Sequence, residues 1–455
     1  MSRRPGVAWV ARCAVPCLGV MVAAAPAGAW SADAFPDSIY SSGFEACAAY
    51  ACAQVRCPGS GTTSVSGTVY APNGTLPLPN VEVYVPNSAV GALATGPGGG
   101  RCDIAPSGHP LVATLTDASG QFTLGNMPVT ANVPLVILAG KWRRQISVPS
   151  VSACTNTAMS AEQTRLPRDH TEGDVAHVAV VTGAGEALEC LMRKFGVADS
   201  EFSTNTGSGR IHLYSGYGAT NHFDLAHGGA TFGDSSSFWS SSANLAAYDQ
   251  VMVACGAVQN PANTIPQSAL DAMRAYADAG GRIYLSHWQN YWLSAGASPW
   301  NTLASWNFSL GTGVDPLTAS VYSGFPQGAT LAAWLAAVGA STTPGQLSVV
   351  QPKQTAVGVD VSLTRYWLYS DSVPATGVSS IQYFSFTTPV DAPLSAQTGR
   401  VIFTDMHASP GDSSTTGTAF PSGGCTTSPS LLAEHEYALV YATFDLQRCV
   451  GSTRE

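Results

Sequence analysis

Residues 248–256 read YDQVMVACG, a short apolar run that breaks off at a Cys-Gly pair. A second run of the same kind, VAVV at residues 178–181, is followed directly by a Thr-Gly pair. Continuous apolar runs of this length are typical of strands that lie in a parallel sheet and are buried on both faces. The two stretches therefore predict an α/β domain built on a mostly parallel sheet.

Helical patterns alternate with these strands, as a parallel sheet requires. Residues 266–279 place Leu270, Met273 and Tyr276 on one helical face, and Gly280-Gly281 follows as a stop signal. The other expected helices are 188–195 and 431–446, and the further expected strands are 211–214, 283–285 and 401–403.

The region before residue 150 has a different pattern. Short alternating segments are separated by turn signals every 8–12 residues, which is typical of a β-sandwich. The expected strands are 65–70, 81–85, 114–116, 122–124 and 134–139, with a turn at 117–120.

The chain of 455 residues is long enough for two or three domains. We expect a signal peptide at 1–29, a Cys-rich lead-in at 30–60, a β-sandwich at 61–150, a connector at 151–173, and an α/β domain at 174–455 with an insertion at about 300–395. Arg3 and Arg4, an apolar stretch and a small-x-small cleavage site support the signal peptide, and an uncleaved anchor is the alternative. The mature protein is therefore expected to be secreted, periplasmic or at the cell surface, with no later membrane span.

Charged residues make up only 11% of the chain, and the formal net charge is −9. No basic run follows the first few residues, so nucleic acid is a poor candidate partner. A glycan or another cell-surface component is the partner class that we retain, and the sequence leaves the oligomeric state open.

Cysteine usage fits an oxidising compartment. The chain has 11 cysteines, and nine remain after removal of residues 1–29, so at least one is free or bonded to another molecule. Cys47, Cys52 and Cys57 lack the spacing of a metal site, and disulfides are the better interpretation. We expect pairs Cys102–Cys154 and Cys425–Cys449, although pairing cannot be derived from sequence.

The first module resembles the carboxypeptidase regulatory-like domain, a transthyretin-like sandwich. The resemblance rests on SGTV at 66–69, LPNVEV at 78–83, TDASGQF at 116–122 and the Met-Pro pair at 127–128. It implies an all-β, non-catalytic spacer or binding platform.

The second module resembles the class I glutamine-amidotransferase-like fold, a flavodoxin-like α/β sandwich. The resemblance rests on residues 248–256, on the helix 268–279 and on residues 283–287. The whole chain also resembles a group of secreted bacterial proteins that share GKWRR at 140–144, SHWQNYW at 286–292 and DMH at 405–407. The fold class is thus a multidomain chain, an all-β transthyretin-like sandwich followed by an α/β flavodoxin-like domain.

Polar residues follow several of the expected parallel strands, where ligands bind in such sheets. Ser286, His287, Asp405 and His407 could form a hydrolase site with Ser286 as nucleophile, His407 as base and Asp405 as orienting group. His287, Asp405 and His407 could instead hold a divalent metal, the one cofactor that the sequence suggests. The alternative is that both histidines have only a structural role, buried and hydrogen-bonded.

The residues of an amidotransferase triad are not in their usual places. The expected elbow holds Ser286 or His287 and no cysteine. Cys255 lies one strand earlier, where it is either a nucleophile or a buried or disulfide-bonded thiol. Glu434, His435 and Glu436, on the last helix, are expected to face solvent.

Two further clusters have alternative interpretations. Trp288, Tyr291, Trp292, Trp300 and Trp306 either stack on sugars or fill the core. The basic run at 141–144 either braces the interface between the modules or binds an anionic glycan.

Taken together, these patterns favour a secreted or cell-surface binding or structural protein with a degenerate amidotransferase-like domain. The alternative is a secreted hydrolase whose Ser/His/Asp or metal-assisted site lies at the carboxyl ends of the strands.

Overall fold

The structure is a computed structural model that describes residues 50–98, 100–309, 314–409, 417–422, 425 and 432–451. The expected signal peptide at 1–29, most of the lead-in and Cys47 lie outside the described residues. All described residues belong to one unit, Ala48–Glu455.

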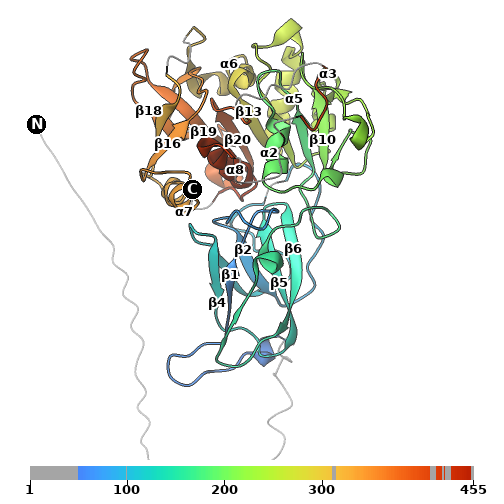
Figure 1. Cartoon of the computed structure of the whole chain (residues 1–455), viewed down its shortest axis with the longest axis vertical. Coiled ribbons are helices and arrows are strands. Elements are labelled where there is room, and N and C mark those ends of the chain that lie inside the picture. The colour runs from blue at the N-terminus through green and yellow to red at the C-terminus, as the bar shows by residue number, and fades with distance from the viewer. Residues whose placement is uncertain are drawn as a thin grey trace, which may run out of the picture. The chain divides into compact units, whose positions relative to one another are not determined.

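Two antiparallel-rich sheets form the N-terminal part of the described chain, coloured blue to cyan in Figure 1. One has the strand order β4-β1-β7 and the other β3-β2-β5-β6. The strands are β1 Ser64–Thr68, β2 Glu82–Pro86, β3 Pro110–Leu115, β4 Gln121–Leu124, β5 Ala131–Ala139, β6 Trp142–Ser150 and β7 Asn156–Ala158. Buried side chains from both sheets, among them Val65 and Val83, belong to one hydrophobic core.

The turn before β4 is held by one aspartate. Asp117 Oδ1 accepts the backbone N–H groups of Ser119 and Gln121 at 2.8 and 2.9 Å. Gly120 has a φ of +74°, and a Cβ there would lie 2.9 Å from the Pro77 side chain. The turn expected at 117–120 is therefore confirmed, and it directs Phe122 into the core.

The second part is one large mixed sheet with the order β11-β10-β8-β12-β13-β20-β19-β18-β15-β16, with β9 paired to β10. Strands β11, β10, β8, β12, β13 and β20 run parallel to one another. Each later pairing, from β20 with β19 to β15 with β16, is antiparallel. The strands are β8 Val178–Val181, β9 Phe202–Ser203, β10 Ile211–Ser215, β11 Gly233–Asp234, β12 Gln250–Val253, β13 Arg282–Ser286, β15 Leu317–Val321, β16 Gln346–Val349, β18 Arg365–Ser370, β19 Ser380–Thr388 and β20 Gly399–Thr404. The expected parallel sheet is confirmed, and the stretch 300–395 adds antiparallel strands to it.

Alternate residues of the central strands enter two different cores. Val178, Val180 and Met252 join the core that also contains the N-terminal sheets. Ala179 and Val253 join a second core on the opposite face. Strand geometry explains the split, because successive side chains point to opposite faces, and burial on both faces explains why these strands read as unbroken apolar runs.

Helices cover both faces of the sheet. The core that contains the N-terminal sheets includes buried residues of α2 Leu188–Lys194, α7 Pro326–Ala337 and α8 Glu434–Leu446. The second core includes residues of α3 Ser235–Phe238, α4 Ser242–Leu245, α5 Gln267–Asp278 and α6 Tyr291–Ser294. The described chain also contains a short helix, α1 Ala161–Thr164, a two-stranded sheet of β14 Ala304–Trp306 and β17 Ala356–Val359, and several single-turn 3-10 helices.

The disulfides correct both expected pairs. The structure joins Cys57 to Cys154, Cys102 to Cys449, and Cys190 to Cys425. Cys102 and Cys449 are far apart in the sequence, so no local pattern predicts their contact, whereas the fold brings the loop after β2 to the chain segment after α8. Several disulfides indicate a compartment outside the cytoplasm.

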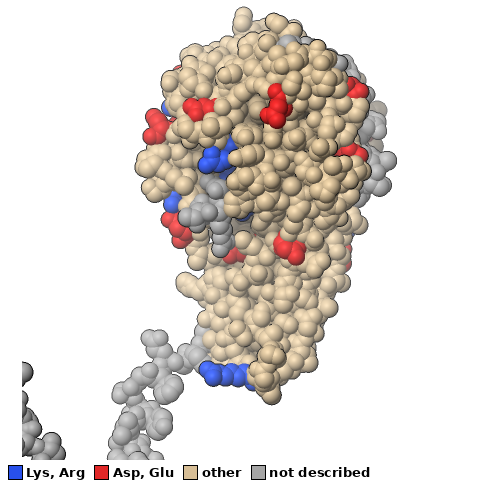
Figure 2. Space-filling model, turned by 90° about the vertical axis from the view of Figure 1, so that its left-hand side faces the viewer, with Lys and Arg blue, Asp and Glu red and all other residues tan. Residues whose placement is uncertain are grey.

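The face drawn in Figure 2 carries single charged side chains among many uncharged ones, in keeping with the low charge content. Among the described residues, no helix has the length and apolar character that a bilayer crossing requires.

Candidate metal centre

Three neighbouring strands deliver one side chain each to the same edge of the sheet. Cys255 follows β12, His287 follows β13 and His407 follows β20. Because these strands are adjacent and parallel, their carboxyl ends meet at one edge. The chain passes from β8 to β10 on one side and then to β12 on the other, so the topological switch point lies between β8 and β12. Ligands bind at such points in open α/β sheets, and Cys255 stands there.

The ligand atoms of the three side chains converge. Cys255 Sγ lies 3.2 Å from His287 Nδ1, and His407 Nε2 lies 3.2 Å from the same nitrogen. All three atoms lie within 4.8 Å of one another. In a tetrahedral zinc site two nitrogen ligands are about 3.4 Å apart, and a sulfur and a nitrogen are about 3.6 Å apart. The spacing therefore suits three ligands of one metal ion.

His287 occupies a strained backbone position. Its φ is +45°, in the left-handed region that costs an ordinary residue about 1–2 kcal/mol. Gln289, two residues later, helps to hold this turn. Its Nε2 donates to Ala254 O at 2.7 Å, and its Oε1 accepts from Trp292 Nε1. Backbone strain that the surroundings enforce is typical of functional sites.

The cluster is buried and electrically neutral. Burial lowers the pKa of His287 to about 3 and the pKa of His407 well below its usual value. Burial, together with the nearby Glu186 carboxyl, raises the pKa of the Cys255 thiol to about 12. A thiolate–imidazolium nucleophile needs the opposite shifts. Neutral imidazoles are metal ligands, and a metal ion displaces the thiol proton when it binds.

No protein-family model and no curated protein matches the chain. Among solved structures it is distantly similar to a ThuA-like protein from Bacteroides uniformis. The match has 13% identity and a TM-score of 0.31, and it covers 58% of this chain and 89% of that one.

Two other solved structures are also similar to parts of this chain. Agd3, described as a novel carbohydrate deacetylase, has 14% identity and a TM-score of 0.28 over 51% of this chain and 29% of its own. A chain of a type II cohesin–X–dockerin complex from Acetivibrio cellulolyticus has 16% identity and a TM-score of 0.16 over 32% of this chain and 78% of its own. At these similarities none of the three carries a functional argument.

The structure brings together two of the predicted site residues, His287 and His407, and places Asp405 elsewhere. Asp405 Oδ2 accepts the backbone N–H groups of Thr355 and Ala356, and its Oδ1 accepts the Thr355 hydroxyl at 2.7 Å. Burial raises the pKa of Asp405 to about 6. Asp405 therefore anchors the start of β17, and Cys255 takes the third place in the cluster.

Ser286, the residue directly before His287, is buried at the end of β13. Its side chain is fully buried, and its hydroxyl lies 3.5 Å from Met406 O and hydrogen-bonds the Glu186 carboxylate. A substrate carbonyl has no path to an oxygen in this position.

The residues after the last strand correct one expectation. Glu434 is exposed as expected, whereas His435 and Glu436 are buried, because this face of α8 packs against the sheet. His435 Nε2 donates to His407 O at 2.9 Å, so this histidine holds the backbone of a cluster residue. The signal that could have found it is the apolar run of α8, which continues on every side of the helix.

The sequence analysis does not predict Cys255 as a ligand, because a single cysteine at a strand end is equally compatible with a nucleophile or a disulfide partner. Among the described cysteines it is the free one. Its place at the end of β12, one strand from His287, is the signal that sequence reasoning could have used.

Proposed function

We propose that this chain is an exported protein that binds one transition-metal ion through Cys255, His287 and His407. Zinc is the metal that we propose. The convergence of their three ligand atoms within 4.8 Å at the switch point of the sheet carries the proposal. Thiolate and imidazole together form a donor set that suits zinc better than magnesium or calcium.

The number of ligands favours hydrolysis as the use of the metal. Structural zinc sites are closed by four protein ligands, whereas catalytic sites have three and leave one position for water. A zinc ion with such a water supplies a hydroxide nucleophile near neutral pH. His287 and His407 are 7% and 5% exposed, so the cluster lies close beneath the surface. The second candidate, a purely structural or binding role, would be supported by metal binding without hydrolysis of any ester or amide.

Half-buried and exposed aromatic rings beside the cluster favour a ring-shaped substrate. The Trp288 ring centroid lies 4.7 Å from that of His287 and 6.3 Å from that of Phe308, whose side chain is 47% exposed. Trp292 and Trp300, in contrast, are buried in the core. Sugar rings stack on such aromatic surfaces, and we include a neutral glycan in the proposal as the substrate class.

Two finer fold assignments belong to the same proposal. Two sheets that share one core support a transthyretin-like module, and a left-handed residue directly after β13 supports an amidotransferase-like elbow. In this interpretation the elbow presents a metal-binding histidine, and the amidotransferase triad is lost.

Metal analysis of the purified mature protein tests the proposal. We expect about one zinc per chain, retained through dialysis, and a thiolate-to-cobalt charge-transfer band after replacement of zinc by cobalt. Cys255→Ser should abolish that band, and His407→Ala should weaken binding at least tenfold.

A histidine at the opposite end of the sheet provides the control. His177 immediately precedes β8, so His177→Ala should bind zinc like the wild type. A wild-type protein that binds neither zinc nor cobalt in the micromolar range would refute the proposal. Tight copper binding with an intense visible band would contradict the hydrolytic part, because that set of ligands also occurs in electron-transfer copper sites.

A further inference from the structure

Glu186 lies directly between β8 and α2, at the same edge of the sheet as the cluster. It is 1% exposed. Its Oε1 accepts the backbone N–H of Cys255 at 2.8 Å, and its Oε2 accepts the backbone N–H of Ala408 at 2.7 Å. The carboxylate also hydrogen-bonds the Ser286 hydroxyl.

Each of these contacts belongs to a different ligand-bearing segment. Cys255 is itself a proposed ligand, Ala408 follows His407, and Ser286 precedes His287. One rigid, planar carboxylate thus touches all three strand ends that deliver the metal ligands. The strand that precedes Glu186, β8, delivers no ligand of its own.

We propose that Glu186 is the positioning residue of the metal centre, which fixes the spacing of Cys255, His287 and His407 by joining their backbone segments. This inference rests on the proposed function, because it gives Glu186 its role only if the three residues bind metal. Partners outside the ligand shell that orient ligands typically change metal affinity 10–100-fold when they are removed.

The turn that leads to Glu186 is built for close approach to Cys255. Gly185 N–H donates to Cys255 O at 2.9 Å. A Cβ on Gly183 would lie 2.2 Å from that same oxygen, and a Cβ on Gly185 would lie 2.8 Å from Cys255 Sγ. Only glycine fits at these two positions, so the chain keeps the carboxylate within reach of the ligand.

A second buried carboxylate offers a matched control. Glu436 is as deeply buried as Glu186, and it accepts the backbone N–H groups of Ser409 and Ala433 and the Lys194 ammonium. In these bonds it contacts none of the three proposed ligands, and it reaches only one ligand-bearing segment, at Ser409, two residues after His407. Loss of either carboxylate should lower stability, but only loss of Glu186 should change the geometry at the metal.

The experiment compares Glu186→Gln and Glu436→Gln with the wild type. Zinc affinity is measured by competition with a chelator of known affinity, the cobalt spectrum reports ligand geometry, and thermal unfolding reports stability. We expect Glu186→Gln to weaken zinc binding 10–100-fold and to alter the cobalt spectrum. Glu436→Gln should leave both unchanged within a factor of about two, although it leaves a buried lysine without its acid and should unfold at a lower temperature.

Several outcomes would overturn the inference. Unchanged affinity and spectrum in Glu186→Gln would show that the carboxylate is structural only, and equal losses in both variants would show that general destabilisation explains the effect. If the wild type binds no metal, the proposed function fails and the inference fails with it. Should Glu186→Gln not fold, Ser286→Ala removes one of the three contacts, and a two- to tenfold loss of affinity is then expected, with an unchanged affinity counting against the role.

Discussion

Buried Arg165 shows how single ionisable residues hold the connector of this chain in place. Its guanidinium is 1% exposed and hydrogen-bonds the carboxylates of Glu162 and Glu172. The hydrogen bonds from Arg165 lower the pKa of Glu172 to about 2. A carboxyl with a depressed pKa in the folded state stabilises the protein above its unfolded pKa, and this contribution disappears as the pH falls through the folded pKa.

We therefore predict a pH-dependent loss for Glu172→Gln. At pH 7 the variant should be less stable than the wild type by about 1 kcal/mol, a figure that allows for solvent screening of a partly exposed pair. The difference should shrink as the pH falls from 4.5, the ordinary pKa, towards 2. Urea unfolding at several pH values measures it. Glu162→Gln removes the more exposed partner of the same arginine and should have a smaller effect, and a difference that stays constant down to pH 2 would contradict the argument.

At the scale of elements, the patterns that predict the structure correctly are those in which one local property decides it. The apolar runs at β8 and β12 predict buried parallel strands because both faces of the sheet are covered. The spacing in α5 predicts its buried face, where Leu270, Met273 and Tyr276 lie in the core. The sequence does not predict the antiparallel strands between 300 and 395, because β18 mixes polar and apolar residues without alternation and the alternation of β15 spans only five residues.

The basic run after β5 is an element-scale prediction that the contacts confirm. Trp142 packs edge-on against Phe195 and Phe444, with ring centroids 6.4 and 6.0 Å away. Arg143 pairs with Asp174 at 2.8 Å. The run therefore braces β6 against the elements of the α/β part.

Replacement of Trp142 should show whether this residue braces the connector in addition to contributing to the overall stability. Trp142→Ala should cost about 3–5 kcal/mol and should expose the connector at 151–173 to limited proteolysis. Trp300→Ala empties an equally buried site in the second core, away from the brace, and should cost a similar amount without cleavage in the connector. Cleavage at the same rate in both variants would show that Trp142 has no special bracing role.

At the scale of the whole molecule, the site and the disulfides could be predicted only in part. Parallel strands bring their carboxyl ends to one edge, so the sequence alone predicts that His287 and His407 lie close together. The choice of Cys255 over Asp405 depends on which way each side chain turns at the strand end, and the contacts of Asp405 with residues 355 and 356 come from a segment far away in sequence. The disulfide pairs depend on the same long-range packing.

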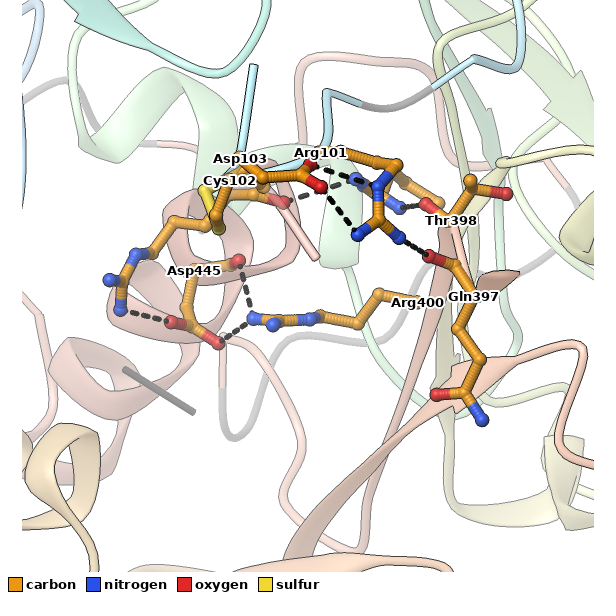
Figure 3. The surroundings of a disulfide bond; sticks show 10 residues. Arg101, Cys102, Asp103, Gln397, Thr398, Arg400 and Asp445 are labelled. Atoms are coloured by element: carbon orange, nitrogen blue, oxygen red, sulfur yellow. Dashed lines mark hydrogen bonds and ion pairs between the residues drawn. A yellow bond between two sulfur atoms is a disulfide. The ribbon is translucent and has the colours of Figure 1, made fainter. Parts of the chain in front are cut away.

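Of the described disulfides, Cys102–Cys449 joins the residues that are farthest apart in the sequence, and Figure 3 shows its surroundings. Arg101 pairs with Asp103 and donates to the carbonyl oxygens of Ser395 and Gln397, while Asp445 pairs with Arg400. Polar contacts thus hold the same loop that the disulfide ties to the chain segment after α8.

Removal of this disulfide should therefore destabilise the folded state without uncoupling the N-terminal sheets from the α/β part. The entropy of closing a loop grows with the logarithm of its length. The sequence separation is 347 for Cys102–Cys449 and 97 for Cys57–Cys154, so Cys102→Ser/Cys449→Ser should lose about 1 kcal/mol more than Cys57→Ser/Cys154→Ser, within a total of about 2–5 kcal/mol. Because one hydrophobic core includes both the N-terminal sheets and α8, calorimetry should still show one cooperative transition. Two separate transitions would mean that the disulfide, and not this shared core, couples the N-terminal sheets to the α/β part.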